Sequence, residues 1–143
     1  MKVRFHYILR PGSYGHPPFL WKASDLSGSS EAATNGYNQY LLSALDTDFN
    51  QNRQGQMDEV LADIEKLERG EIDRCMAGTA DTLMHTLTRE KVTFEHSIFG
   101  ECPEWPLWSC TLAQYKAALQ GYRKFLDMPE SIDSELIVEL PDG

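Results

Sequence analysis

One segment near the C-terminal end constrains the fold most, because it has the pattern of a single amphipathic helix with both ends marked. It covers residues 110–129, CTLAQYKAALQGYRKFLDMP. Its apolar side chains recur at steps of three and four, which places them on one helical face; they are Leu112, Tyr115, Leu119, Tyr122 and Leu126. Thr111 and Gln114 fit a capping box at the start, and Pro129 prevents continuation at the end. We expect this helix to close a compact core of helices and strands.

Six other segments have the character of strands. Residues 2–9 alternate Val3, Phe5 and Tyr7 with polar side chains, which is typical of a half-buried strand. Residues 16–21, HPPFLW, are extended by two prolines and predict a short edge strand. The remaining candidates are residues 71–77, 82–88, 91–98 and 136–140. Two residues, Arg89 and Glu90, separate the middle pair, which is the spacing of a tight hairpin.

Two further helices are predicted before the C-terminal one. Residues 31–45 carry apolar side chains at helical spacing, although Gly36 weakens the pattern. The second helix follows from the spacing of apolar residues from Met57 to Leu67, and Gly70 is placed to end it. Loops are expected over residues 24–30, 46–56 and 100–108. We therefore predict one α+β domain, residues 1–143, in which an antiparallel sheet packs against two or three helices.

The balance of charge limits the kinds of partner. The chain has 22 acidic and 13 basic residues, for a formal net charge of −9. Such a chain repels phosphate backbones, so we expect no nucleic-acid partner and favour a basic protein partner. No segment has the pattern of a membrane span, and the N-terminal residues interleave charges with apolar side chains, unlike a signal peptide. We expect a cytoplasmic protein with no membrane partner.

Groups that could carry chemistry are scattered along the chain. Cys75, Cys102 and Cys110 include no CxxC pair, so we expect reduced thiols and neither a disulfide nor a structural zinc site. Glu95 and His96 are neighbours on a predicted strand, where their side chains point to opposite faces and cannot share a proton. We predict no cofactor, no metal and no catalytic residue.

Acidic residues gather in two segments. Residues 58–73 contain seven acids against Lys66 and Arg69, and residues 127–142 contain six acids and no base. Each segment is either a solvated face or a docking surface whose negative potential attracts a basic partner.

A second candidate surface lies in the loop before the C-terminal helix. Trp105 and Trp108 stand among prolines there, with Glu101 and Glu104 beside them. A tryptophan near carboxylates can anchor an Arg or Lys of a partner through apolar area and cation–π attraction. The alternative is that both indoles pack into the core. Across the two surfaces, the residues predicted to bind a partner are Glu65, Glu68, Glu71, Asp73, Glu101, Glu104, Trp105 and Trp108.

Three stretches resemble a known family. They are GEID at 70–73, TREKVTFEHSIFGE at 88–101 and LAQYKAALQGYRKFLDMPES at 112–131. In layout they are similar to the C-terminal half of small bacterial immunity proteins of polymorphic-toxin and contact-dependent growth inhibition systems. The resemblance covers about residues 56–140 and leaves the N-terminal residues 1–56 without an assigned role.

The resemblance implies a function without catalysis. Immunity proteins of this kind bind one cognate toxin, often a nuclease, in the cytoplasm and block its active site. We therefore expect a toxin-binding protein that is a monomer or a weak dimer. Two alternatives stay open: a small enzyme whose site is assembled from dispersed groups such as His6, His96 and Glu95, and a housekeeping protein of unassigned role.

Overall fold

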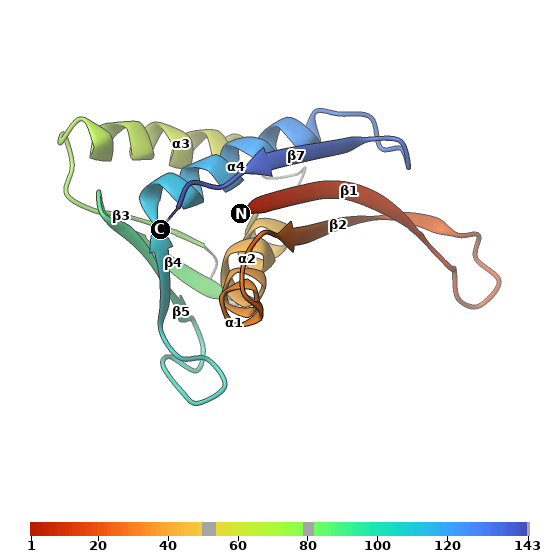
Figure 1. Cartoon of the computed structure of the whole chain (residues 1–143), viewed down its shortest axis with the longest axis horizontal. Coiled ribbons are helices and arrows are strands. Elements are labelled where there is room, and N and C mark those ends of the chain that lie inside the picture. Colours follow the sequence, from red (N-terminus) through yellow and green to blue (C-terminus); the bar gives the residue numbers. More distant parts are fainter. Residues whose placement is uncertain (50–53, 79–81, 143) are drawn as a thin grey trace.

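The structure, a computed structural model, describes residues 1–49, 54–78 and 82–142. Its elements in chain order are β1 (Lys2–Arg10), β2 (Phe19–Ser27), α1 (Glu31–Gly36), the π-helical η1 (Tyr37–Leu42), α2 (Ser43–Asp48), α3 (Gln54–Glu68), β3 (Cys75–Gly78), β4 (Leu83–Leu87), β5 (Lys91–His96), β6 (Trp108–Thr111), α4 (Leu112–Leu126) and β7 (Glu135–Glu139). Helices and antiparallel strands of separate segments pack together, which confirms the predicted α+β class (Figure 1).

The strands form two antiparallel sheets where the sequence suggested one. The first sheet has the order β2-β1-β7 and the second the order β3-β4-β5-β6. β4 and β5 are joined by the predicted two-residue turn at Arg89 and Glu90, since the Thr88 backbone N–H donates to the Lys91 carbonyl at 2.9 Å. β2 runs on to Ser27, through residues expected to form a loop. β6 begins at Trp108, the last residue of the expected loop 100–108, and ends at Thr111, the residue expected to cap the C-terminal helix. Both elements are strands because they pair with a neighbouring strand, β1 in the case of β2 and β5 in the case of β6. The composition of a segment does not indicate which strand it will pair with.

α4 is the centre of the core. It contacts α3, β7, β1, β5 and β6, so it joins both sheets (Figure 1). Its start is the predicted capping box: the Gln114 backbone N–H donates to Thr111 Oγ1 at 3.1 Å, and the Thr111 backbone N–H donates to Gln114 Oε1 at 3.1 Å. The predicted apolar face is buried at every position, namely Leu112, Tyr115, Leu119, Tyr122 and Leu126.

Gly121 lies where α4 approaches β7 most closely. A Cβ built on Gly121 would meet Val138 Cγ2 at 2.3 Å and Val138 Cβ at 3.3 Å. The branched valine cannot swing away freely, so the strand itself has to shift. Gly121→Ala should therefore destabilise the protein by about 1–3 kcal/mol in urea denaturation, although alanine favours a helix by about 1 kcal/mol over glycine.

The matched control is Gly55→Ala in α3, where nothing lies within 4 Å of the added methyl group. That change should be neutral or slightly stabilising, because only helix propensity acts. Equal effects at the two glycines would show that β7 does not press on α4 at Gly121.

The helical segment 31–48, formed by α1, η1 and α2, is longer than predicted. The sequence indicated a helix over 31–45 and a polar connection from residue 46, whereas the structure continues the helix to Asp48. Ser30 caps its start by accepting a hydrogen bond from the Ala33 backbone N–H at 3.3 Å. Asp48 is buried although it is acidic. Its partners, described below, explain why the helix extends into a polar stretch.

Candidate functional site

The loop between β5 and β6, residues 97–107, carries the largest apolar side chains exposed at this end of the molecule. We call it the apolar loop. Ile98 is 63% exposed, Phe99 67% and Leu107 48%. Soluble proteins rarely leave apolar side chains gathered in the open unless the surface binds something. The loop lies at the bottom of Figure 1, after β5.

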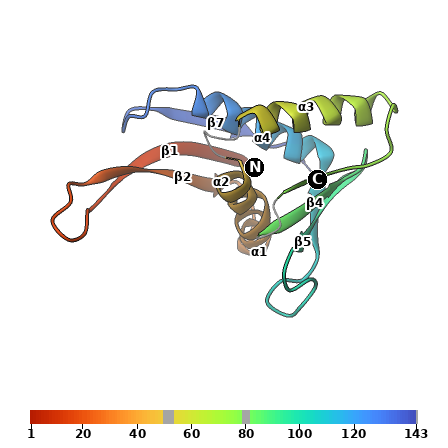
Figure 2. The ribbon, with the colours of Figure 1, turned by 180° about the vertical axis from the view of Figure 1, so that it is seen from behind.

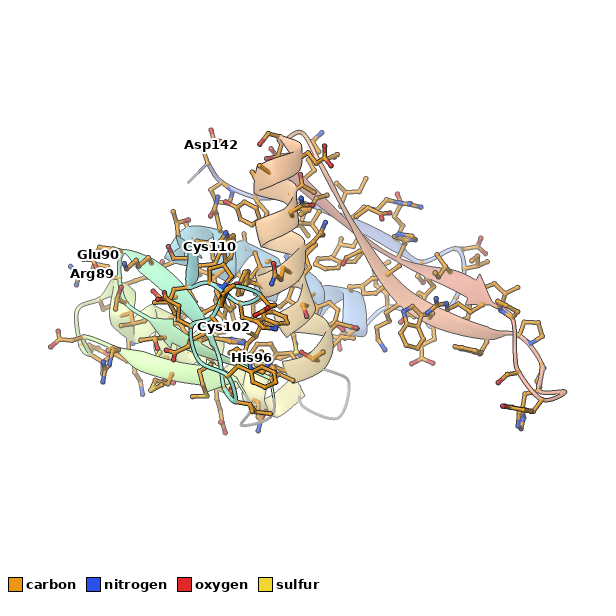
Figure 3. All side chains as sticks on the ribbon, turned by 90° about the horizontal axis from the view of Figure 1, so that it is seen from below. Arg89, Glu90, His96, Cys102, Cys110 and Asp142 are labelled. Atoms are coloured by element: carbon orange, nitrogen blue, oxygen red, sulfur yellow. The ribbon has the colours of Figure 1, made fainter. Side chains whose placement is uncertain are left out.

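His96 holds the first half of the apolar loop in place. Its Nδ1 accepts hydrogen bonds from the backbone N–H groups of Ile98 and Phe99, each at 3.2 Å. The imidazole also stacks on Phe99 and packs against Trp105, with ring centroids 4.7 and 5.0 Å apart. Figure 3 shows His96 and Cys102 close together beside the helical segment 31–48. These contacts give His96 a positioning role that the sequence did not reveal.

The second half of the apolar loop is tied to the helical segment 31–48. Cys102 and Trp105 exchange two backbone hydrogen bonds, at 3.0 and 3.2 Å. Gln39 Nε2 donates to the Glu104 carbonyl at 3.1 Å, and the Tyr40 hydroxyl donates to the Pro106 carbonyl. The loop is therefore presented as an ordered surface. An ordered loop loses less conformational entropy on binding than a flexible one.

The two tryptophans have different surroundings. The Trp108 indole stacks on Tyr40 at 5.4 Å and packs against Tyr37 and Phe94, so most of its contacts lie within the core. Trp105 packs edge-on to Tyr40 at 5.8 Å and is half-buried. Together with Phe99, Cys102 and Glu104, Trp105 lines an open hollow on the surface. Of the two, Trp105 is the one placed to meet a partner.

Carboxylates surround the apolar loop. Glu95, Glu101 and Glu104 are exposed. In the described residues, none of the three forms an ion pair with a Lys or Arg side chain. Their charge is thus available to an approaching partner. An apolar centre with an anionic rim matches a partner that presents cations around an apolar patch.

The acidic face of α3 is more neutral than its sequence indicates. Glu68 forms an ion pair with Lys116 of α4 at 2.7 Å. Glu71 pairs with Arg69 at 3.1 Å, and Glu65 lies 4.0 Å from the same guanidinium. Asp73 is exposed between α3 and β3. These cations reduce the negative potential that the face offers.

The predicted binding residues therefore fall into two separate groups. Glu101, Glu104 and Trp105 gather on the apolar loop, with Trp108 beneath it. Glu65, Glu68, Glu71 and Asp73 belong to α3 and the turn that follows. Figures 1 and 2 both place α3 at the top of the molecule and the apolar loop at the bottom. The two groups are therefore separate candidate surfaces, and a partner docked on one lies away from the other.

A buried polar network was missed by sequence reasoning. His85 Nε2 lies 2.9 Å from Asp48 Oδ2, and His85 Nδ1 lies 3.0 Å from the Tyr115 hydroxyl. Thr82 Oγ1 donates to the other Asp48 oxygen. Asp48, His85 and Tyr115 are each at most 1% exposed. The sequence offered no local signal for this contact, because Asp48 lies in the expected loop 46–56 and His85 lies on a predicted strand far along the chain.

The hydrogen-bond partners on the two sides of His85 favour one tautomer of the neutral ring. Burial, followed by nearby acidic groups, raises the pKa of Tyr115 well above its ordinary value, so its hydroxyl remains a donor. In the neutral imidazole, the Tyr115 hydroxyl donates to Nδ1, and Nε2–H then donates to the Asp48 carboxylate. The three groups satisfy one another inside the core, where no substrate reaches them. The network is a structural connection between α2, β4 and α4.

The groups named for the alternative enzyme are not assembled. His6, on β1, lies 2.8 Å from Asp25 of β2, whereas His96 and Glu95 belong to the other sheet. The three cysteines are free thiols, and burial raises the pKa of Cys110 to about 12. In the ranges that the structure describes, no three His, Cys, Asp or Glu side chains are grouped to hold a metal ion.

Comparison with protein-family models, curated proteins and solved structures finds no match to this chain. Among the helices described, none has both the length and the apolar character needed to cross a membrane.

Proposed function

We propose that this chain is a protein-binding module of the immunity class, which neutralises a basic toxin domain by covering its active site. The observation that carries the proposal is the apolar loop: exposed Ile98, Phe99 and Leu107 on an ordered loop with unpaired carboxylates around them. The net charge of −9 and the resemblance of residues 56–140 to immunity proteins support the same proposal.

The chemistry of the loop suggests how inhibition works. A nuclease cleft is lined with cations that bind phosphates. Glu101 and Glu104 can occupy the positions of those phosphates, while Phe99 and Trp105 bury apolar area beside them. Opposite potentials speed the encounter, and the apolar contacts slow dissociation. Such a complex blocks substrate entry without any reaction in the inhibitor.

Reversing the loop charges should weaken the encounter. With the double change Glu101→Lys and Glu104→Lys, we expect association with the cognate toxin domain to slow by about tenfold or more at low salt, because attraction becomes repulsion. The difference should shrink as salt screens the charges. Stopped-flow or surface plasmon resonance measures both rates. The candidate toxin is the C-terminal domain encoded by the gene immediately upstream.

The matched comparison is Glu68→Lys with Glu71→Lys on α3, which makes the same change in total charge. A smaller effect there would place the docking surface on the apolar loop. If only the α3 pair slows association, the docking surface is on α3. Co-expression should also rescue cells from that toxin and from no unrelated one. Rescue without a physical complex would overturn the proposal and point to an enzymatic antidote.

A further inference from the structure

The hairpin formed by β1 and β2 extends beyond the rest of the molecule. Figures 1 and 2 show it projecting away from α3, α4 and the second sheet. β1 pairs with β2 along its whole length, but β7 covers β1 only from Lys2 to His6. Residues 7–22 therefore form a two-stranded arm, a structure that is only marginally stable by itself in water.

Both faces of the arm are apolar. Residues paired across the two strands share a face, so Ile8 lies with Trp21, and Leu9 with Leu20. Ile8 is 36% exposed, Trp21 45%, Leu9 62% and Leu20 36%. Phe19 adds a ring edge-on to Trp21 at 6.1 Å. So much exposed apolar area on two faces indicates that a binding partner covers the arm.

The charge of the arm is opposite to that of the chain. Residues 7–22 include Arg10 and Lys22 and no acid, whereas the whole chain has a net charge of −9. The Arg10 guanidinium lies over the Trp21 ring at 5.0 Å. The arm therefore suits an acidic partner, unlike the apolar loop. An acidic surface is present on every copy of this chain.

One edge of the arm is open for strand pairing. The Leu140 backbone N–H donates to the Met1 carbonyl at 2.8 Å, so odd-numbered residues of β1 direct their backbone groups toward β7. By this alternation Tyr7 and Leu9 point their N–H and C=O groups to the same side. β7 has already ended there, and in the described ranges no strand other than β2, on the opposite edge, pairs with Tyr7–Arg10. Unpaired edges of this kind readily pair with another chain.

An acidic loop flanks this open edge. It consists of residues 129–134, between α4 and β7, and it carries Glu130, Asp133 and the 58% exposed Ile132. Glu135, the first residue of β7, pairs with His6, so the loop that precedes it reaches the base of the arm. Neither Glu130 nor Asp133 forms an ion pair within the described residues. The edge thus runs from an acidic base to a basic tip.

We propose that two copies of this chain form a twofold dimer by antiparallel pairing of their β1 edges at Tyr7–Arg10. Because β7 blocks the edge up to His6, the symmetry axis lies at Leu9. Each Arg10 then meets Glu130 and Asp133 of the other copy, and the two Leu9 side chains lie side by side on one face of the joined sheet. Such an interface is self-complementary and closed, as a twofold dimer requires.

The test is sedimentation equilibrium of the full chain over a wide range of concentrations. The natural chain should approach twice the 16.3 kDa of one chain as concentration rises. Arg10→Glu should raise the dimer dissociation constant by about tenfold or more, because like charges then face each other twice. Arg74→Glu is the matched control: Arg74 is exposed just before β3, outside the arm, and its reversal should leave the dimer unchanged.

A mixing experiment separates specific pairing from a loss of folding. The variant Glu130→Lys with Asp133→Lys should also fail to form a dimer alone, because Arg10 then faces lysines. A mixture of this variant with Arg10→Glu should form a heterodimer, since each contact again joins opposite charges. A natural chain that stays monomeric, an Arg10→Glu chain that forms the dimer as the natural chain does, or a mixture without heterodimer would each overturn the proposal.

Discussion

Replacing Asp48 by alanine should lower the free energy of unfolding by about 1–3 kcal/mol, the cost typical of leaving a buried hydrogen-bond donor without its acceptor. The carboxylate is 1% exposed and accepts hydrogen bonds from His85 and Thr82, so its loss leaves the buried Nε2–H of His85 without this acceptor. Urea denaturation followed by circular dichroism measures the change.

Two further variants make this test specific. Asp48→Asn keeps one acceptor oxygen, so we expect a smaller loss than for alanine. Glu59→Ala removes an exposed acid from α3 and should change stability by less than about 0.5 kcal/mol. If Asp48→Ala and Glu59→Ala unfold at the same urea concentration, the buried network does not stabilise this protein.

Replacing Leu119 by alanine should cost about 2–5 kcal/mol, the range found for large-to-small changes at buried leucines. Leu119 is fully buried in α4, the helix that contacts both sheets and α3. The close-packed core relaxes only partly around the cavity that this change creates. The same denaturation experiment measures the loss.

Leu107→Ala is the control for that loss. Leu107 is 48% exposed on the apolar loop, so truncation there should leave stability within about 0.5 kcal/mol. The pair of leucines thus separates folding from binding: the first change should unfold the protein more easily, and the second should weaken only the complex. An unchanged unfolding midpoint for Leu119→Ala would contradict the central position of α4.

The two proposed surfaces are independent of each other. The apolar loop and the arm lie on opposite sides of the helical segment 31–48 (Figure 3), and they carry opposite charges. A dimer formed through the arms leaves Phe99, Glu101 and Glu104 exposed for a basic partner. Each copy could then bind its own toxin domain, so loss of the dimer and loss of toxin binding are expected from different substitutions.

Local signals in the sequence determined several elements without help from the rest of the chain. The start of α4 follows from Thr111 and Gln114, because a capping box satisfies backbone donors within four residues. The end of α3 follows from Gly70, whose φ of 75° suits glycine. The alternation of Val3, Phe5 and Tyr7 predicted which face of β1 is buried. In each case the deciding interaction spans only a few residues.

Only the tertiary structure decided which distant segments meet and which side chains they leave exposed. Asp48 and His85 are 37 residues apart, and their pairing explains why α2 continues through an acidic stretch. β6 exists because it pairs with β5, and the half-buried Trp108 packs against the core because it stacks on Tyr40. Cations of α4 neutralise part of the negative charge of α3, as the ion pair between Glu68 and Lys116 shows. All of these features depend on contacts between distant segments, and no local sequence pattern encodes the energies of such contacts. The sequence by itself therefore indicated an acidic α+β protein, and the tertiary structure determined which side chains lie on its surface.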